Sequence, residues 1–459
     1  MDAASASPVP ECARCRELEA RVLELETKLR DLEDRLTPPP KRGPEPQPPA
    51  PAKTPTGKKR GAQPGHKPHL KQWLPCERVT DVVAYVPPRC EKCTAALSPT
   101  AGPNDPPPTI HQVAELPKIL AEVTEYQGHS RTCACGHVTK SCIPAAIRAD
   151  SIGPNLSAAM VYFAGSHGMS KRGIEETVET LFGVPIAVGT IANLEQEASA
   201  ALEPAYREVR RHVAEADVKH IDETGWKEAG KKRWLWAAAT LEAVLFLIHP
   251  RRNLDALKLL LGKLSGILIS DRWCVYDGWD YESRQLCWAH VKRNWDKQIE
   301  RGGRAKELGE RWQAVQKEVF ELWHRFRGGG CTRVELTDRM VPHIESLGEL
   351  LGVGVRSRDA RLSGHCDRLL ERYPLLWLFV SVAGVEPTNN HAERVQRRAV
   401  LWRRKSFGCQ SPSGCRFVER ILSVVQTLRL QKRNALEFLG QTIAAHRRGL
   451  PTPSLCPTG

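Results

Sequence analysis

The sequence contains no apolar stretch long enough to cross a membrane. No run approaches the ~20 apolar residues that a spanning helix needs, and no positively charged start is followed by the apolar core of a signal peptide. We therefore expect a cytoplasmic protein, in a compartment where thiols stay reduced. The 15 cysteines, an odd number, are then expected to be metal ligands or buried thiols and not a disulfide framework.

Acidic residues are scarce relative to basic ones. Against 67 Lys and Arg there are 53 Asp and Glu, so the formal net charge is +14. An excess of this sign suggests a polyanionic partner such as DNA, with acidic lipid as the competing possibility. At 459 residues the chain is too long for one ordinary core, so we expect several domains.

The N-terminal part is predicted to be a coiled coil followed by a linker. In 12–36, apolar residues alternate at spacings of three and four, which is typical of a seam that joins two chains. The alternative is an amphipathic helix docked on its own domain. Residues 37–72 are rich in proline and then basic, which favours an extended linker whose basic end can lie along phosphates.

Two close cysteine pairs in 73–145 indicate a zinc-binding module. Each pair is expected on a tight turn, and the two can converge on one tetrahedral structural Zn²⁺. The expected ligands are Cys90, Cys93, Cys133 and Cys135, with Cys76, Cys142 and His137 as spare candidates. Reduced buried cysteines are the alternative reading.

Residues 151–216 read as helical. An amphipathic helix, a break at Gly183 and a second helix that starts near Ala187 follow the pattern of a helix-turn-helix. In such a motif the second helix is available for the major groove of DNA. The alternative is a short helical hairpin that contacts no DNA.

From residue 217 the pattern changes to short apolar strands. We expect three antiparallel strands, a helix and two further strands, which is the order of an α/β ribonuclease H-like fold with a mixed sheet. The catalytic domain would comprise 217–290 and 386–445, interrupted by a helical insertion over 291–385. The expected strands lie in 217–226 (ending at Asp222), 233–241, 243–250, 266–271 (ending at Asp271) and 285–290.

Carboxylates at the ends of these strands suggest metal-dependent chemistry on phosphodiesters. Two Mg²⁺ ions can activate the attacking oxygen and stabilise the leaving oxygen, and such hard cations prefer oxygen ligands. We select Asp222, Asp271 and Glu393, the last in the first turn of a late basic helix. A strand-end Asp is usually a turn residue, and the competing acids are Glu223, Asp277 and Asp280.

Several sequence blocks resemble, in order and spacing, those of transposases of the insertion-sequence-66 family. The blocks are HIDETGWK, SDRWCVYDGW, CWAHVKRNW and TNNHAERVQRRAVLWRRKSFG, preceded by the cysteine pairs, RGAQPGHK and the coiled-coil pattern. The resemblance implies a bacterial DDE-type transposase that cleaves element ends and transfers strands. Asp222, Asp271 and Glu393 would bind two Mg²⁺ or Mn²⁺ ions. Its implied partners are double-stranded DNA, further copies of the chain and accessory element proteins. Thr388 departs from the Asp that many relatives have there.

The late basic helix is expected to hold DNA phosphates around Glu393. The candidate DNA-binding residues are Asn389, Asn390, Arg397, Arg403, Arg404 and Lys405. His290 could orient a phosphate or the attacking water, and is equally expected as a packed structural residue. The alternative function is a catalytically silent protein that binds element ends as a repressor.

Overall fold

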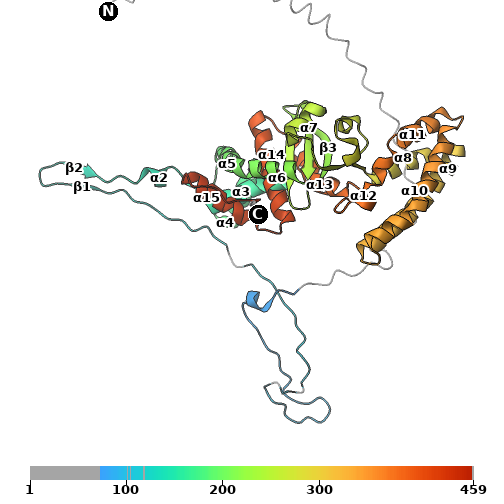
Figure 1. Ribbon diagram of the computed structural model, residues 1–459. Coiled ribbons are helices and arrows are strands. Elements are labelled where there is room, and N and C mark those ends of the chain that lie inside the picture. Colours follow the sequence, from blue (N-terminus) through green and yellow to red (C-terminus); the bar gives the residue numbers. More distant parts are fainter. Residues whose placement is uncertain (1–72, 101, 104, 117–118, 457–459) are drawn as a thin grey trace, which may run out of the picture. The chain divides into compact units, whose positions relative to one another are not determined.

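The computed structural model describes residues 73–100, 102–103, 105–116 and 119–456 (Figure 1). The predicted coiled coil (12–36) and linker (37–72) lie outside these residues. The chain divides into two compact units, Met1–Glu115 and Leu116–Gly459. Within the described helices, none is both long and apolar enough to span a membrane.

The described part of the first unit is mostly extended. It contains the short 3-10 helix η1 (Cys76–Arg78) and a tight turn closed by a bridge between Arg89 and Ala96. The amide of Gln112 holds the start of this segment, because its oxygen accepts from Leu74 N at 2.8 Å.

The second unit begins with a hairpin and a group of helices. The hairpin strands are β1 (Ser130–Thr132) and β2 (Val138–Lys140), and the helices are α2 (Ala145–Arg148), α3 (Pro154–His167), α4 (Lys171–Phe182), α5 (Val188–Ala201) and α6 (Glu203–Glu215). Gly183 ends α4 in the left-handed conformation, with φ 69°. The predicted helix, break and second helix are therefore present.

The central element is a mixed five-stranded sheet in the order β5-β4-β3-β6-β7. β5, β4 and β3 are antiparallel neighbours, whereas β3, β6 and β7 run parallel. The strands are β3 (Val218–Glu228), β4 (Lys231–Ala239), β5 (Val244–His249), β6 (Ile267–Ser270) and β7 (Arg284–Leu286). Helix α7 (Leu254–Leu261) precedes β6, as predicted.

Two predicted strand bounds are wrong. β3 runs on to Glu228 because it pairs with β4 from His220 to Glu228, so Asp222 lies in the middle of a strand. The segment 285–290 is only briefly a strand, since Trp288 already begins helix α8 (Trp288–Ile299). His290 is therefore a helical residue.

Helix α14 (Pro412–Leu430) closes the outer edge of the sheet with polar side chains. Alternate backbone N–H groups of β5 donate to side chains one turn apart on α14: Ile248 to Glu419 (2.6 Å), Phe246 to Ser423 (2.9 Å) and Val244 to Thr427 (3.0 Å). An edge strand otherwise presents unpaired N–H groups to solvent or to another chain. This ladder satisfies them inside the fold.

One hydrophobic core joins the sheet to helices from both sides of the sequence. Buried side chains of α3–α6 pack with those of β3–β5, α7, α13 (Asn390–Ser406), α14 and α15 (Ala435–Arg447). Tyr206 Oη on α6 donates to Phe246 O at 2.8 Å. The helix-turn-helix-like region is thus part of the same packed body as the sheet.

The segment between the sheet and α13 is a helical insertion with its own core. After α8 come α9 (Gly303–Arg327), α10 (Arg333–Val355), α11 (Ala360–Leu370), η4 (Tyr373–Leu376) and α12 (Leu378–Ser381). Figure 1 shows α9, α10 and α11 grouped together beyond the strands. The core of the insertion includes Ile269 and Leu286, so the insertion packs directly on β6 and β7.

Candidate active site

The parallel strands β3 and β6 bring Asp222 and Asp271 side by side, with Asp222 on β3 and Asp271 just after β6. The register pairs His220 of β3 with Ile269 of β6, and each aspartate follows its paired residue by two positions. β6 ends at Ser270, so Asp271 lies directly after the strand, as predicted. The loop is fixed there because Asp271 Oδ1 accepts from Trp273 N at 2.9 Å.

Helix α13 brings Glu393 and Gln396 to the same place. Glu393 lies in the first turn of the helix, and Gln396 follows it on the buried side, where 6% of its surface is exposed. With its amide oriented to satisfy both neighbours, Gln396 donates to Asp222 Oδ2 (2.8 Å) and accepts from Thr224 N (3.2 Å). The helix is thereby held against β3 beside the aspartate.

The site concentrates negative charge around Asp222. Burial raises the pKa of Asp222 to about 7, with further increases from the charges of Glu223, Asp271 and Glu393. Three acidic side chains from the same strand, a loop and a helix therefore act on the carboxyl group of Asp222. Such a group favours the binding of a cation, which would lower the cost of ionising the buried aspartate.

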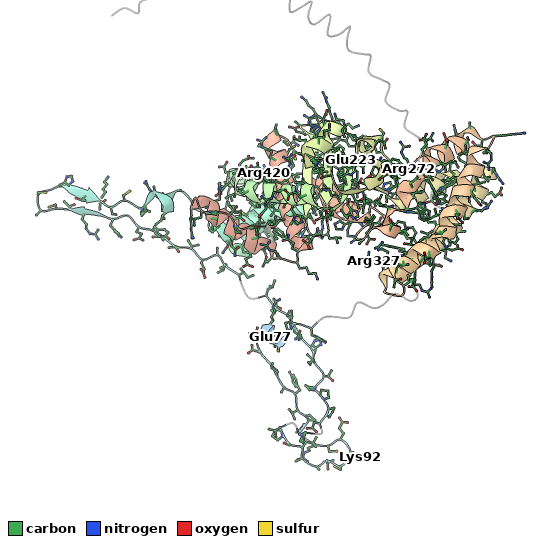
Figure 2. The ribbon with its side chains drawn as sticks, viewed as in Figure 1. Glu77, Lys92, Glu223, Arg272, Arg327 and Arg420 are labelled. Atoms are coloured by element: carbon green, nitrogen blue, oxygen red, sulfur yellow. The ribbon has the colours of Figure 1, made fainter. Side chains whose placement is uncertain are left out.

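Glu223 already has hydrogen-bond partners within the protein. Its side chain is 1% exposed, and Arg252 donates to it from Nε (2.8 Å) and from Nη2, while the Tyr276 hydroxyl donates to the other oxygen. The guanidinium of Arg252 lies over the ring of Trp273, 3.7 Å from its centre. Figure 2 shows Glu223 at the sheet. Glu223 thus tethers the loop after Asp271 and is not a free ligand.

The other two competing acids also have structural partners. Asp277 accepts from Arg284 (2.7 Å) and from Arg372 (3.1 Å). Asp280 precedes the 3-10 helix η3 (Tyr281–Ser283) and accepts from Ser283 Oγ at 2.6 Å. These contacts favour Asp222 and Asp271 over Glu223, Asp277 and Asp280.

Helix α8 faces Glu393 with two basic side chains. Arg293 Nη2 donates to Glu393 Oε1 at 3.1 Å, and His290 Nδ1 lies 3.8 Å from the same oxygen. Burial and the charge of Arg293 lower the pKa of His290, so its ring is neutral at pH 7. The two residues are three positions apart on the helix, which is the spacing of a shared face.

The start of α13 is anchored through Asn389, which is fully buried. Its amide nitrogen donates to Ile221 O at 2.7 Å, and its amide oxygen lies 3.1 Å from His220 Nδ1. Burial lowers the pKa of His220 to about 4, so the ring is neutral and donates to this oxygen. The prediction that Asn389 contacts DNA is therefore wrong, because the protein itself uses the amide to position the helix of Glu393.

The basic side chains of α13 separate into two groups. Arg403 is half-buried and donates to Gly225 O and to Thr224 Oγ1 (3.1 Å), and Lys405 Nζ donates to His167 O (3.0 Å). Arg403 therefore braces the helix against β3 through Nη1, and its binding of a phosphate stays a prediction. The side chains of the second group are exposed and make no hydrogen bond or ion pair with any described residue. These are Arg394, Arg397, Arg398 and Arg404, together with the uncharged Asn390.

The donor set of Asp222, Asp271 and Glu393 fits a hard divalent cation such as Mg²⁺. All three offer carboxylate oxygens, and the charges of Asp271 and Glu393 contribute to the raised pKa of Asp222. Among the described residues, no three His, Cys, Asp or Glu side chains converge closely enough to hold one ion as they stand. The side chains of Asp222 and Glu393 would have to leave Gln396 and Arg293 to do so.

The cysteine pairs both lie on tight turns, as predicted. In the first unit, Thr94 N donates to Cys90 O at 2.9 Å, and the backbone N–H groups of Cys93 and Lys92 lower the pKa of Cys90. In the second unit, Cys133 N donates to His137 O at 2.8 Å. Both turns favour the thiolate, the form that binds zinc. That the pairs share one zinc stays a prediction.

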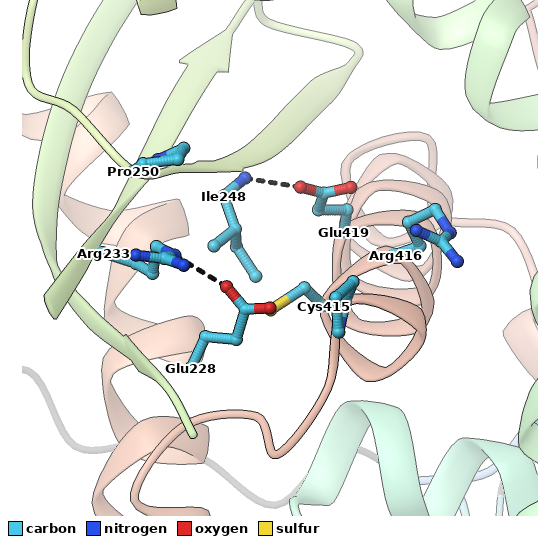
Figure 3. A pocket seen from close by; sticks show the side chains of 8 residues that line it. Glu228, Arg233, Ile248, Pro250, Cys415, Arg416 and Glu419 are labelled. Atoms are coloured by element: carbon cyan, nitrogen blue, oxygen red, sulfur yellow. Dashed lines mark hydrogen bonds and ion pairs between the residues drawn. The ribbon is translucent and has the colours of Figure 1, made fainter. Parts of the chain in front are cut away.

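A pocket of about 300 Å³ lies apart from the carboxylates (Figure 3). Its lining comes from the β3–β4 hairpin, β5 and α14, and includes Glu228, Arg233, Cys415 and Glu419. Glu228 accepts from Arg233 Nε at 2.6 Å. No residue of the predicted triad lines this pocket, so it is not the candidate active site.

Sequence reasoning missed four residues of the site: Arg252, Tyr276, Arg293 and Gln396. Arg293 could have been found, because it lies three residues after His290 in a segment with helical spacing. The contacts of Arg252 and Tyr276 with Glu223 join residues far apart in the sequence. No local sequence pattern predicts these contacts with Glu223.

Comparisons with known proteins identify a family. The model of the Transposase IS66 family matches residues 150–416, more than half of the chain, and this range contains all three carboxylates. "Uncharacterized protein y4hP" of Sinorhizobium fredii (strain NBRC 101917 / NGR234) is 23% identical over 415 residues, which cover 82% of this chain and 74% of that protein. "Uncharacterized protein y4qI" of the same organism is 25% identical over 248 residues, or 49% of this chain and 46% of that protein.

Proposed function

The chain belongs to the IS66 family of transposases, and on this premise we propose that it binds the ends of an insertion sequence and catalyses metal-dependent DNA cleavage and strand transfer. The observation that carries the proposal is the parallel register of β3 and β6, which places Asp222 beside Asp271. Helix α13 adds Glu393. The strand order supports a ribonuclease H-like catalytic domain.

Asp222, Asp271 and Glu393 would hold two Mg²⁺ or Mn²⁺ ions. When bound, such ions activate the attacking oxygen and stabilise the leaving oxygen of a phosphodiester. In the first step water attacks the scissile phosphorus, the P–O bond to the 3′ oxygen breaks, and a 3′-hydroxyl is left. In the second step that hydroxyl attacks a phosphodiester of the target, so one P–O bond forms as another breaks.

The protein's own groups would position these reactants. Gln396 holds Asp222, the Arg252–Glu223–Tyr276 contacts fix the loop of Asp271, and Asn389 fixes the helix of Glu393. The exposed arginines of α13 supply charge for DNA phosphates on the same helix. Arg293 is a cation beside Glu393, and could hold a phosphate once a metal engages that carboxylate.

A DNA-cleavage assay tests the proposal. Purified protein is incubated with an end-labelled duplex that carries the terminal repeat of the element, and with a random duplex, in Mg²⁺, in Ca²⁺ or in EDTA. We expect nicks at the repeat boundary in Mg²⁺ only. Tight binding to the repeat without nicks in Mg²⁺ or Mn²⁺ would instead support the silent repressor, and absence of binding would contradict both.

A further inference from the structure

Three arginines gather beside Asp271, where the sheet meets the helical insertion. Arg272 follows Asp271 directly, Arg368 lies on α11, and Arg372 lies just beyond that helix. Arg368 lies one turn before Arg372, and Arg372 Nη2 donates to Asp277 Oδ2 (3.1 Å) in the loop that follows Asp271, so the end of α11 faces the loop that carries Arg272. Figure 2 shows Arg272 on the side of the sheet toward the insertion.

Two acidic side chains near this cluster, Asp277 and Glu371, already have arginine partners. Asp277 accepts from Arg372 at 3.1 Å and from Arg284 at 2.7 Å, and Glu371 also pairs with Arg372. Arg284 is only 2% exposed, and its Nε and Nη2 have no hydrogen-bond partner among the described residues. The arginines here therefore carry more positive charge than Asp277 and Glu371 can balance.

Arg272 and Arg368 are left without partners. Neither side chain makes a hydrogen bond or an ion pair with any residue that the structure describes, although Arg272 is half-buried. A guanidinium group that is partly removed from water, without a partner and next to two like charges, is costly. Asp271 is the nearby acid that attracts Arg272, and it is a proposed metal ligand.

The insertion holds Arg368 in a fixed position relative to the sheet. The amide of Gln285 on β7 donates to Leu376 O (3.0 Å) and accepts from Phe379 N (2.9 Å), and Trp288 Nε1 donates to Leu376 O (2.7 Å). Tyr281 Oη donates to Glu371 O at 2.8 Å. These bonds tie the segment after α11 to β7 and to η3, the 3-10 helix just before that strand.

We propose that Arg272 and Arg368 together bind a phosphate of the DNA backbone beside Asp271. One guanidinium comes from the end of β6 and the other from the insertion. Guanidinium groups match phosphate oxygens with paired hydrogen bonds, and a phosphate would offset the repulsion within the cluster. The insertion would then contribute to the DNA-binding surface in addition to packing on the sheet. This inference rests on the proposed function in that the anion is taken to be DNA.

His365 supports a site for an anion at this position. It lies one turn before Arg368 on α11, is 6% exposed, and its Nε2 has no partner among the described residues. Burial and the charges of Arg272 and Arg368 lower its pKa to about 4, so the ring adds no charge at pH 7. A neutral ring can still donate one hydrogen bond to a phosphate oxygen.

The test compares DNA binding by the full-length protein and by single variants. Arg272→Ala, Arg368→Ala and Arg311→Ala are measured by fluorescence anisotropy with repeat-containing and random duplexes at several salt concentrations. Arg311 is an exposed arginine of α9 that has no partner among the described residues, so it removes the same charge from the same insertion. Thermal unfolding is recorded for each variant.

Arg272→Ala and Arg368→Ala should each weaken binding to both duplexes alike, by about ten-fold at low salt. Each should also lower the salt slope of log K by about 0.9, whereas Arg311→Ala should change neither quantity. Arg272→Ala should not lower the melting temperature, because its side chain has no partner to lose.

Wild-type affinity and slope in both variants would overturn the site while leaving the proposed function intact. If Arg272→Ala fails to fold, Arg368→Ala decides alone, since its side chain is exposed. If the wild-type protein binds neither duplex, the proposed function itself fails. The two failures are therefore distinguishable.

Discussion

Asn389 shows how a residue that looks like a ligand in the sequence is instead a positioning residue. It lies four residues before Glu393, in a segment crowded with arginine, where an exposed amide would suit DNA. In the fold it is fully buried and joins β3 to the first turn of α13 through Ile221 O and His220. The position of Glu393 relative to Asp222 depends on this contact.

Replacing Asn389 with alanine should therefore affect stability and cleavage but not the salt dependence of DNA binding. The change leaves the buried Ile221 carbonyl and the His220 ring without partners, which costs about 1–3 kcal/mol in the free energy of unfolding. Urea unfolding measures this cost. Asn390→Ala, at the exposed next position, should change it by less than about 0.5 kcal/mol. Equal effects of the two substitutions would contradict the role of Asn389.

At the scale of single residues, the predicted strand end at Asp271 is confirmed. Asp271 directly follows β6, and the apolar run before it made that end visible. Asp222 was selected for the same reason, but its strand continues for six residues, to Glu228. Its place in the site comes instead from the register with β6, which no local pattern encodes.

At the scale of elements, the ladder between α14 and β5 covers the edge of the sheet and also buries the carboxyl group of Glu419. Glu419 is 9% exposed and accepts from Ile248 N. Burial raises the pKa of Glu419 to about 7, from 4.5 in an unperturbed carboxyl. Between these values the folded protein binds a proton that the unfolded chain does not. The contribution of this group to stability is therefore lost as pH rises from about 4.5 to 7.

The substitution Glu419→Gln should remove this pH dependence. The glutamine oxygen can still accept from Ile248 N, while no charge has to be buried above pH 7. At pH 8 the variant should be more stable than the wild-type protein, by roughly 3 kcal/mol as an upper value. At pH 4.5 the two should be equally stable. Urea midpoints at both pH values measure the difference, and a constant offset at both would show that the carboxyl does not titrate between them.

Sequence patterns predicted the elements better than their edges. The alternating and apolar runs indicated all five strands, and Gly183 marked the end of α4. The ladder was not predictable, because Glu419, Ser423 and Thr427 at a spacing of four resemble a solvent-facing stripe. Their burial follows from a strand that is distant in the sequence.

At the scale of the whole molecule, the carboxylates lie where a shared core and a separate helical insertion meet. The core joins helices α3–α6 to the sheet, and the insertion packs on β6 and β7 through Ile269 and Leu286. The sequence predicted a helical insertion, because 291–385 read as mostly helical between the two parts of the catalytic domain. It could not predict that the end of α11, with Arg368, would face the loop of Arg272, because that arrangement depends on how the insertion docks.

The central claim is that Asp222, Asp271 and Glu393 act together on DNA. Its most direct test is the rate of Mg²⁺-dependent nicking of repeat-containing DNA by Asp222→Asn, Asp271→Asn and Glu393→Gln, with DNA affinity measured in parallel. Asp280→Asn is the control, since it removes an exposed acid from the segment that follows Asp271.

Loss of a residue that merely supports a metal ligand costs about 10–100-fold, so each triad substitution should slow nicking by more than about a hundred-fold. DNA affinity should stay near that of the wild-type protein, and Asp280→Asn should cleave normally. Wild-type nicking by any one of the three triad variants would contradict the account, because that carboxylate could then not be part of the catalytic site.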